Sequence, residues 1–299
     1  MRPPPPITNS DIKAELAARL KEHAAKVAQW RAALRPMGKA PQAARPIFAL
    51  AQGDSWFDYP LGGCVPFAQR TDMIALLPAV LPVGSSVVSL AHFGLATTEE
   101  LGLSRQRDMI STLRNAANWA DGKPDAILFS GGGDDICGDQ FLMYLDYADE
   151  SGSTGLNAER FAALLASVRA SYLALFAFRD RYAPGVPIIG HAYDFAIPSG
   201  VAVAPGVGPW LAPALEQVGR LSQGRSIVKD ALTRFNAMLA DFEKDGSRKF
   251  YVARTQGLLA EEEWANELHP TPAGFAKMAK VAADAVAKAL PTHFAAAGS

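Results

Sequence analysis

Five short apolar stretches alternate with longer segments of helical pattern, and this alternation constrains the fold of the 299-residue chain more than any other feature. We expect strands near 46–51, 86–90, 125–130, 186–190 and 249–253, and helices near 70–78, 104–120, 157–182, 224–243 and 272–290. Strands that alternate with helices imply right-handed crossovers and a parallel sheet covered on both faces. The sequence therefore predicts an α/β fold, a three-layer α/β/α sandwich around a mostly parallel five-stranded sheet.

The residues before the first predicted strand form a separate segment. Four consecutive prolines, Pro3–Pro6, favour an extended start, and Asn9 or Ser10 can cap a helix that runs to about Arg35. We therefore divide the chain into an N-terminal Pro-rich segment with a helical extension, residues 1–45, and an α/β domain, residues 46–299. The helix either packs on the domain or mediates a homo-oligomer.

Composition limits the partners that we expect. The formal charge of −1 at pH 7 gives no reason to expect nucleic acid or an anionic membrane as a partner. The sequence has no uninterrupted apolar stretch of about 18 residues, so we expect no membrane span. Its first residues lack the apolar core of a signal peptide, which predicts a cytoplasmic protein. Neither a metal-ligand spacing nor a phosphate-binding loop is present, so we expect no cofactor and no metal.

The first predicted strand is followed by a glycine and, two residues later, by a serine. Gly53 allows a sharp turn that exposes Ser55 beyond the carboxyl end of the strand, where α/β folds place reactive groups. A histidine, His269, precedes the last predicted helix. A serine and a histidine can act as nucleophile and general base. Taken singly, Ser55 is also a good helix cap and His269 an ordinary polar turn residue.

Four short blocks follow one another along the chain: Gly53-Asp54-Ser55, Gly94 after the second predicted strand, Gly132-Gly133-Asp134-Asp135 after the third, and Asn266-Glu267-Leu268-His269-Pro270. In their order and spacing they resemble the blocks of the GDSL-type, or SGNH, serine hydrolases. The resemblance covers roughly residues 46–290 and implies the flavodoxin-like SGNH hydrolase fold. It also implies Ser55 as nucleophile, His269 as base, and the backbone N–H groups of Ser55 and Gly94 as donors to the oxyanion. Asp54 and Gly133, which lie in the same blocks, are further candidates for the site.

Two positions depart from the family pattern. The family has an asparagine that donates to the oxyanion where this chain has Asp134, and an aspartate that orients the histidine where this chain has Asn266. An ionised Asp134 has no proton to donate. It is therefore protonated through burial and a neighbouring charge, turned away, or part of a site with a different or impaired activity. Glu267 either supplies the missing carboxylate or is a solvated surface acid.

These residues predict a serine esterase that hydrolyses small acyl, carbohydrate or lipid esters through a Ser–His pair. Its partner would be a small-molecule ester, and no metal would take part. The alternative is a catalytically impaired SGNH-like protein that binds a ligand or a partner protein.

Two further features lie near the predicted site. The loop at 191–213 is rich in glycine and proline and follows the fourth predicted strand, so we expect it to border the site. Cys64 and Cys137 each follow one of the blocks. They are either two reduced thiols, the usual state in a cytosolic protein, or a disulfide.

Overall fold

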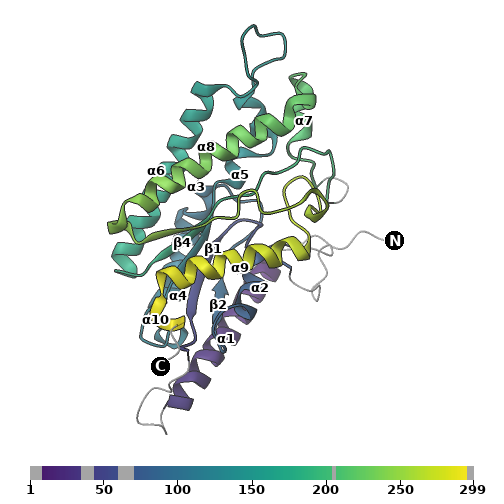
Figure 1. The fold of residues 1–299 in the computed structure, drawn as a ribbon. Helices are drawn as coiled ribbons and strands as arrows, with labels where there is room; N and C mark the ends of the chain where they lie inside the picture. Colours follow the sequence, from purple (N-terminus) through teal and green to yellow (C-terminus); the bar gives the residue numbers. More distant parts are fainter. Residues whose placement is uncertain (1–8, 35–43, 60–70, 204–206, 295–299) are drawn as a thin grey trace.

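The protein contains one five-stranded sheet in which every neighbouring pair of strands is parallel. The computed structural model describes residues 9–34, 44–59, 71–203 and 207–294 (Figure 1). The strands are β1 (Phe48–Gly53), β2 (Ser86–Ser89), β3 (Ile127–Ser130), β4 (Ile188–His191) and β5 (Phe250–Ala253), in the spatial order β2-β1-β3-β4-β5. The predicted α/β sandwich with a parallel sheet is confirmed, and each strand lies within a few residues of its expected position.

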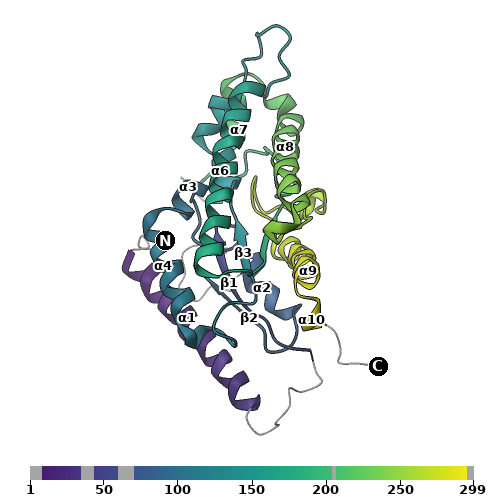
Figure 2. The same ribbon diagram turned by 90° about the vertical axis from the view of Figure 1, so that its left-hand side faces the viewer.

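Helices cover both faces of the sheet (Figures 1 and 2). Helix α9 packs against α2 and along β4 and β5, whereas α6 packs against α4 and α8. The helices after β1 are α2 (Met73–Leu76), α3 (Thr97–Glu100), α4 (Leu103–Arg114), α5 (Gly133–Ile136), α6 (Ala158–Tyr182), α7 (Ala212–Gln217), α8 (Gly224–Lys244), α9 (Pro272–Ala289) and α10 (Pro291–Phe294). By length and composition α6 could cross a membrane, but here it packs against α3, α4 and α8.

Two predicted helices are shorter than expected. The one expected at 104–120 ends at Arg114, because the side chain of Asn115 accepts a hydrogen bond from Ala117 N and starts a separate 3₁₀ turn. The one expected at 70–78 lies partly outside the described residues. Its described part begins after Asp72, whose side chain caps α2, and continues from Leu77 as a 3₁₀ turn.

The N-terminal helix α1 (Asn9–Leu34) docks against β2 through a buried histidine. His23 lies with Nδ1 2.9 Å from Ser86 Oγ and Nε2 2.9 Å from the Asn118 carbonyl oxygen. Because the carbonyl can only accept, Nε2 carries a proton. Burial lowers the pKa of His23 to about 4, so the ring is neutral at pH 7. Of the two expected roles of this helix, packing on the domain is observed, and the homo-oligomer stays a prediction.

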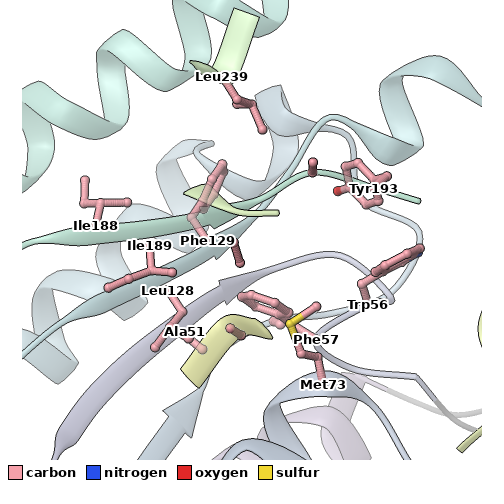
Figure 3. Close-up of a cluster of buried hydrophobic side chains, with 14 of the residues drawn as sticks. Ala51, Trp56, Phe57, Met73, Leu128, Phe129, Ile188, Ile189, Tyr193 and Leu239 are labelled. Atoms are coloured by element: carbon pink, nitrogen blue, oxygen red, sulfur yellow. The ribbon is translucent and has the colours of Figure 1, made fainter. Parts of the chain in front are cut away.

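The hydrophobic core continues directly into the turn that carries Ser55. Leu128 and Phe129 of β3 and Ile188 and Ile189 of β4 are buried between the sheet and the helices (Figure 3). Trp56, Phe57 and Tyr193 extend this core beyond the carboxyl ends of the strands (Figure 3). The turn after β1 is therefore packed on its inner side by aromatic rings.

Candidate active site

The turn after β1 requires glycine at its first position. A Cβ on Gly53 would lie 2.3 Å from the carbonyl oxygen of Ser130 and 2.7 Å from its Cβ. Asp54 N donates to that same carbonyl at 3.1 Å, and the Asp54 carboxylate accepts from Trp56 N at 3.0 Å. These contacts fix the turn between two strands and leave Ser55 at its tip, 9% exposed.

Ser55 and His269 are brought together although 214 residues separate them. Ser55 Oγ lies 2.7 Å from His269 Nε2, and His269 Nδ1 lies 3.0 Å from Asn266 Oδ1. Burial lowers the pKa of His269 to about 3, so its imidazole is neutral at neutral pH. A neutral imidazole with Nδ1 protonated presents the Nε2 lone pair to the serine hydroxyl, as a general base must.

The amide of Asn266 can adopt one orientation only. Its Oδ1 also accepts from the backbone N–H groups of Leu268 and His269, each at 3.0 Å, and its Nδ2 donates to Tyr59 OH at 2.7 Å. A flipped amide would point its NH₂ group at two N–H donors. In serine proteases, an asparagine in place of the aspartate costs about 10⁴ in rate because it selects the wrong histidine tautomer. Here the locked amide oxygen selects the right one.

A narrow pocket of about 40 Å³ opens beside Ser55. Its lining is mostly apolar and comes from α8, the region of α5 and the loop at 191–213 after β4, hereafter the β4 loop. The lining residues include Tyr193, Ala196, Leu211, Val228, Leu232 and Cys137. The expectation that the loop at 191–213 borders the site is therefore confirmed. Cys64 lies outside the described residues, so whether it pairs with Cys137 stays untested.

Asp134 lines the same pocket and has few hydrogen-bond partners. Its Oδ2 is buried without a partner among the described residues, and its Oδ1 lies 3.8 Å from the Cys137 thiol. Burial, together with the charges of Asp54 and Asp135, raises the pKa of Asp134 well above its usual value. Of the alternatives raised by the sequence, these surroundings favour a protonated carboxyl group.

Glu267 is fully buried, so the expectation of a solvated surface acid is wrong. Its carboxylate accepts hydrogen bonds from four backbone N–H groups of the β4 loop, those of Gly200 (2.9 Å), Trp210 (2.5 Å), Leu211 (2.7 Å) and Ala212 (3.0 Å). The carboxylate is thus occupied by the loop rather than by the imidazole of His269. It ties the segment that contains His269 to the wall of the pocket.

A second buried carboxylate, which the sequence reasoning missed, makes the reciprocal connection. Asp194 follows β4 and accepts from the backbone N–H groups of Phe195, Gly257, Leu258 and Leu259. Asp194, in the loop after β4, therefore binds the backbone of the loop after β5. Glu267, which follows β5, binds the backbone of the loop after β4. A carboxylate four residues after the end of a predicted strand was the signal available in the sequence.

A different Ser–His pair lies beneath the Ser55 turn. Ser130 Oγ is 2.7 Å from His191 Nε2 and donates to Asp54 Oδ1 at 2.6 Å, and Tyr193 OH donates to the other oxygen of Asp54. Ser130 is completely buried and burial raises the pKa of Asp54 to about 6. An inaccessible hydroxyl cannot attack a substrate, so this network supports the turn. Asp54, a candidate from the sequence, belongs to this support.

The two candidate glycines differ in their surroundings. Gly94 is exposed after β2 with φ of 74°, and a Cβ there would meet nothing within 4 Å. Gly133 begins α5, and a Cβ there would lie 2.8 Å from the ring of Tyr193. Gly133 thus allows α5 to approach the pocket, whereas the role of Gly94 as an oxyanion donor stays a prediction. Within the described ranges, no group of three or more His, Cys, Asp or Glu side chains could hold a metal ion.

No family model and no curated protein matches the sequence. Solved structures do match. The lipase Lip_vut3 from a goat rumen metagenome is 15% identical over 79% of this chain and 96% of its own, with a TM-score of 0.53. The extracellular lipase of Streptomyces rimosus is 18% identical over 79% of this chain and 98% of its own, with a TM-score of 0.50. At these identities the likeness shows that this chain shares their fold.

Proposed function

We propose that the protein is a serine hydrolase of the GDSL/SGNH type that cleaves carboxylic esters. The 2.7 Å contact between Ser55 Oγ and His269 Nε2, at the mouth of an apolar pocket, carries the proposal. The four blocks in the sequence and the fold shared with two lipases support it. Among the described residues that line this apolar pocket, Ser55 is the only serine.

The geometry supports acyl transfer in two steps. Ser55 Oγ attacks the ester carbonyl carbon while its proton moves to His269 Nε2, and that proton then passes to the departing alcohol. The acyl group remains on Ser55. Water, deprotonated by His269, attacks the acyl-serine, and the collapse of the second tetrahedral intermediate releases the acid and restores the Ser55 hydroxyl.

Asp134, as a neutral acid, would complete the oxyanion site. A carboxyl group that keeps its proton donates an O–H hydrogen bond, as the asparagine of the family donates an N–H. The backbone N–H groups of Ser55 and Gly94 are the other donors that the sequence predicts. Asp134 would then donate through an O–H group where the asparagine of the family donates through an N–H group, and the oxyanion site would keep its donor.

The size of the pocket favours short acyl chains. A single water molecule needs roughly 10–15 Å³ of such space, so about 40 Å³ accommodates only a few heavy atoms. A methyl or propyl group has no polar atom that needs a partner, so it would pack against the apolar lining. We therefore propose acetyl to butyryl esters as the preferred substrates.

Hydrolysis of p-nitrophenyl esters, from acetate to octanoate, tests the proposal. Wild-type protein should prefer the short esters, and Ser55→Ala should lose at least about 10³ in kcat, because the nucleophile is removed. A fluorophosphonate probe should label Ser55 in the wild type and also in Ser130→Ala, which removes the hydroxyl of the buried pair. Labelling of Ser130, or full activity in Ser55→Ala, would contradict the assignment.

One observation favours the second candidate, a ligand-binding protein without turnover. Ser55 and His269 are only 9% and 4% exposed, which restricts the approach of a substrate. This alternative predicts no labelling of Ser55, no hydrolysis of any ester in the series, and a raised melting temperature with a short-chain ester or acid. Rapid labelling of Ser55 would exclude it.

A further inference from the structure

The proposed reaction places a positive charge on a ring that no carboxylate of the described residues contacts. When His269 takes the proton of Ser55 it becomes an imidazolium, and its Nδ1 partner is the neutral amide of Asn266. A neutral amide orients the ring but cannot offset its charge. The imidazole is 4% exposed, so water offers little stabilisation. Another group beside the ring has to supply it.

Among the residues that the structure describes, the groups that contact the imidazole are all uncharged. Ser55 and Asn266 occupy its two nitrogens, and the rings of Tyr59 and Trp210 lie against it. Burial is the cause that lowers the pKa of His269 to about 3. The carboxylate of Glu267, next but one in the chain, is occupied by four backbone N–H groups.

Tyr59 lies face to face with the imidazole. The ring centroids are 4.1 Å apart and the planes are inclined by 14°, whereas the ring of Trp210 lies 5.5 Å away at 76°. The phenol is 4% exposed, and burial raises its pKa, so it is neutral under ordinary conditions. The face of a neutral aromatic ring carries the negative part of its quadrupole and attracts a cation within about 6 Å.

We propose that the ring face of Tyr59 stabilises the imidazolium of His269 in the transition state and so replaces the carboxylate that Asn266 lacks. The inference rests on the proposed esterase function of the same site. Tyr59 also accepts a hydrogen bond from Asn266 Nδ2, which holds the amide that orients His269. One side chain thus provides both the orientation and the charge stabilisation that an aspartate would provide. Because it acts through His269, Tyr59 is a positioning residue.

Graded fluorination of the ring at position 59 separates electrostatics from packing. The reference is Tyr59→Phe, and the series replaces that phenylalanine by analogues with one, two and three ring fluorines, which keep the shape but weaken the quadrupole. A desolvated cation–π contact of about 2 kcal/mol corresponds to roughly 30-fold, so kcat should fall stepwise by about 10- to 30-fold across the series. KM should change little, because the charge exists only after proton transfer.

The matched control is the same series at Phe275. This fully buried ring packs on Tyr59 at 5.9 Å but makes no ring contact with His269 in the described structure, so fluorination there should leave kcat unchanged. In the background of Asn266→Asp, a carboxylate offsets the charge. The dependence of kcat on fluorination at position 59 should then flatten.

The outcomes distinguish this inference from the proposed function. Ester hydrolysis by the wild type with a flat fluorination series would overturn the role of Tyr59 and leave the esterase intact. Absence of hydrolysis would overturn the esterase. In that case the midpoint of the His269 imidazole titration, followed by NMR in ¹⁵N-histidine-labelled protein, decides the ring contact alone: it should fall with each fluorine, and a constant midpoint would contradict the contact.

Discussion

Buried acidic side chains lie on two sides of the sheet edge that the C-terminal ends of the strands form, and their surroundings differ. On the β4–β5 side, Asp194 and Glu267 each accept hydrogen bonds from four backbone N–H groups. On the β1–β3 side, Glu100 and Asp134 have carboxyl oxygens without a partner among the described residues. Burial and neighbouring acids raise the pKa of both Glu100 and Asp134 well above the usual range.

The difference shows how one residue type serves two purposes. A carboxylate that accepts hydrogen bonds from several backbone N–H groups joins loops firmly, as Asp194 and Glu267 do. A carboxyl group that is buried without donors keeps its proton and becomes a hydrogen-bond donor. The nucleophile and its base lie between these two environments. One side holds the base in place, and the other can supply a proton donor to the oxyanion.

The largest expected effect on stability tests the β4–β5 side. Glu267→Gln replaces one acceptor oxygen by an NH₂ group that faces backbone N–H donors, so it should lower the free energy of unfolding by about 2–4 kcal/mol. Glu100→Gln, the control on the other side, should lose nothing at pH 7, because an amide needs no proton to be buried neutral. Urea unfolding measures both. Equal losses in the two variants would show that the two sides do not differ.

The next effect concerns activity. Asp134→Ala should lower kcat by about 10²–10³, the usual effect of removing one oxyanion donor. Asp134→Asn should keep most of the activity at neutral pH. The wild type donates only while Asp134 is protonated, so its activity should fall as pH rises through the raised pKa of this group, and the asparagine variant should lack that fall.

The pH profiles of kcat for short esters check this second prediction. Asp134→Glu, which keeps the acid but shifts its position, serves as the geometric control and should keep the alkaline fall at a lower rate. A large gain in the activity of Asp134→Asn at neutral pH would mean that Asp134 is ionised, which would remove the contrast between the two sides.

Local patterns were enough to predict the sheet and the blocks that meet at its edge. Strand-like stretches such as Ile127–Ser130 are apolar and short, and Gly53 marks the end of β1. The resemblance of the four blocks to those of the SGNH hydrolases implied that Ser55 pairs with His269, and the two side chains are in contact. The roles of the acids were not predictable in this way. Whether a carboxyl group is ionised depends on how many N–H groups reach it, and those donors come from distant loops.

Glu267 and Tyr59 illustrate this limit. Glu267 is adjacent to Leu268 in an active-site block, yet its donors lie 55–67 residues away, in a loop whose path no local pattern specifies. Tyr59 lies four residues after the nucleophile, and no local pattern distinguishes it from an ordinary core aromatic residue. Its stacking on His269 depends on how the turns after β1 and β5 approach each other.

The smallest expected effect is a change in how the free energy of unfolding depends on pH. It tests the β1–β3 side without a measurement of activity. Burial raises the pKa of Glu100 in the folded protein above its ordinary value of 4.5. Above pH 4.5 the folded state keeps the proton of Glu100, which the unfolded chain has released. The contribution of Glu100 to the free energy of unfolding therefore falls as pH rises, until pH exceeds the raised pKa of Glu100 in the folded protein. The gain of Glu100→Gln over the wild type should therefore grow with pH, by about 1 kcal/mol per unit.

Urea unfolding of both proteins at several values between pH 5 and 8 measures this difference. His23, His191 and His269, whose pKa values burial lowers to about 4, 4 and 3, destabilise both proteins as pH falls below about 6.5 and cancel in the comparison. Asp54, with a pKa of about 6, is also common to both. A difference that stays constant with pH would mean that Glu100 is ionised in the folded protein. Its oxygens would then need donors like those of Glu267, and the two sides would be alike.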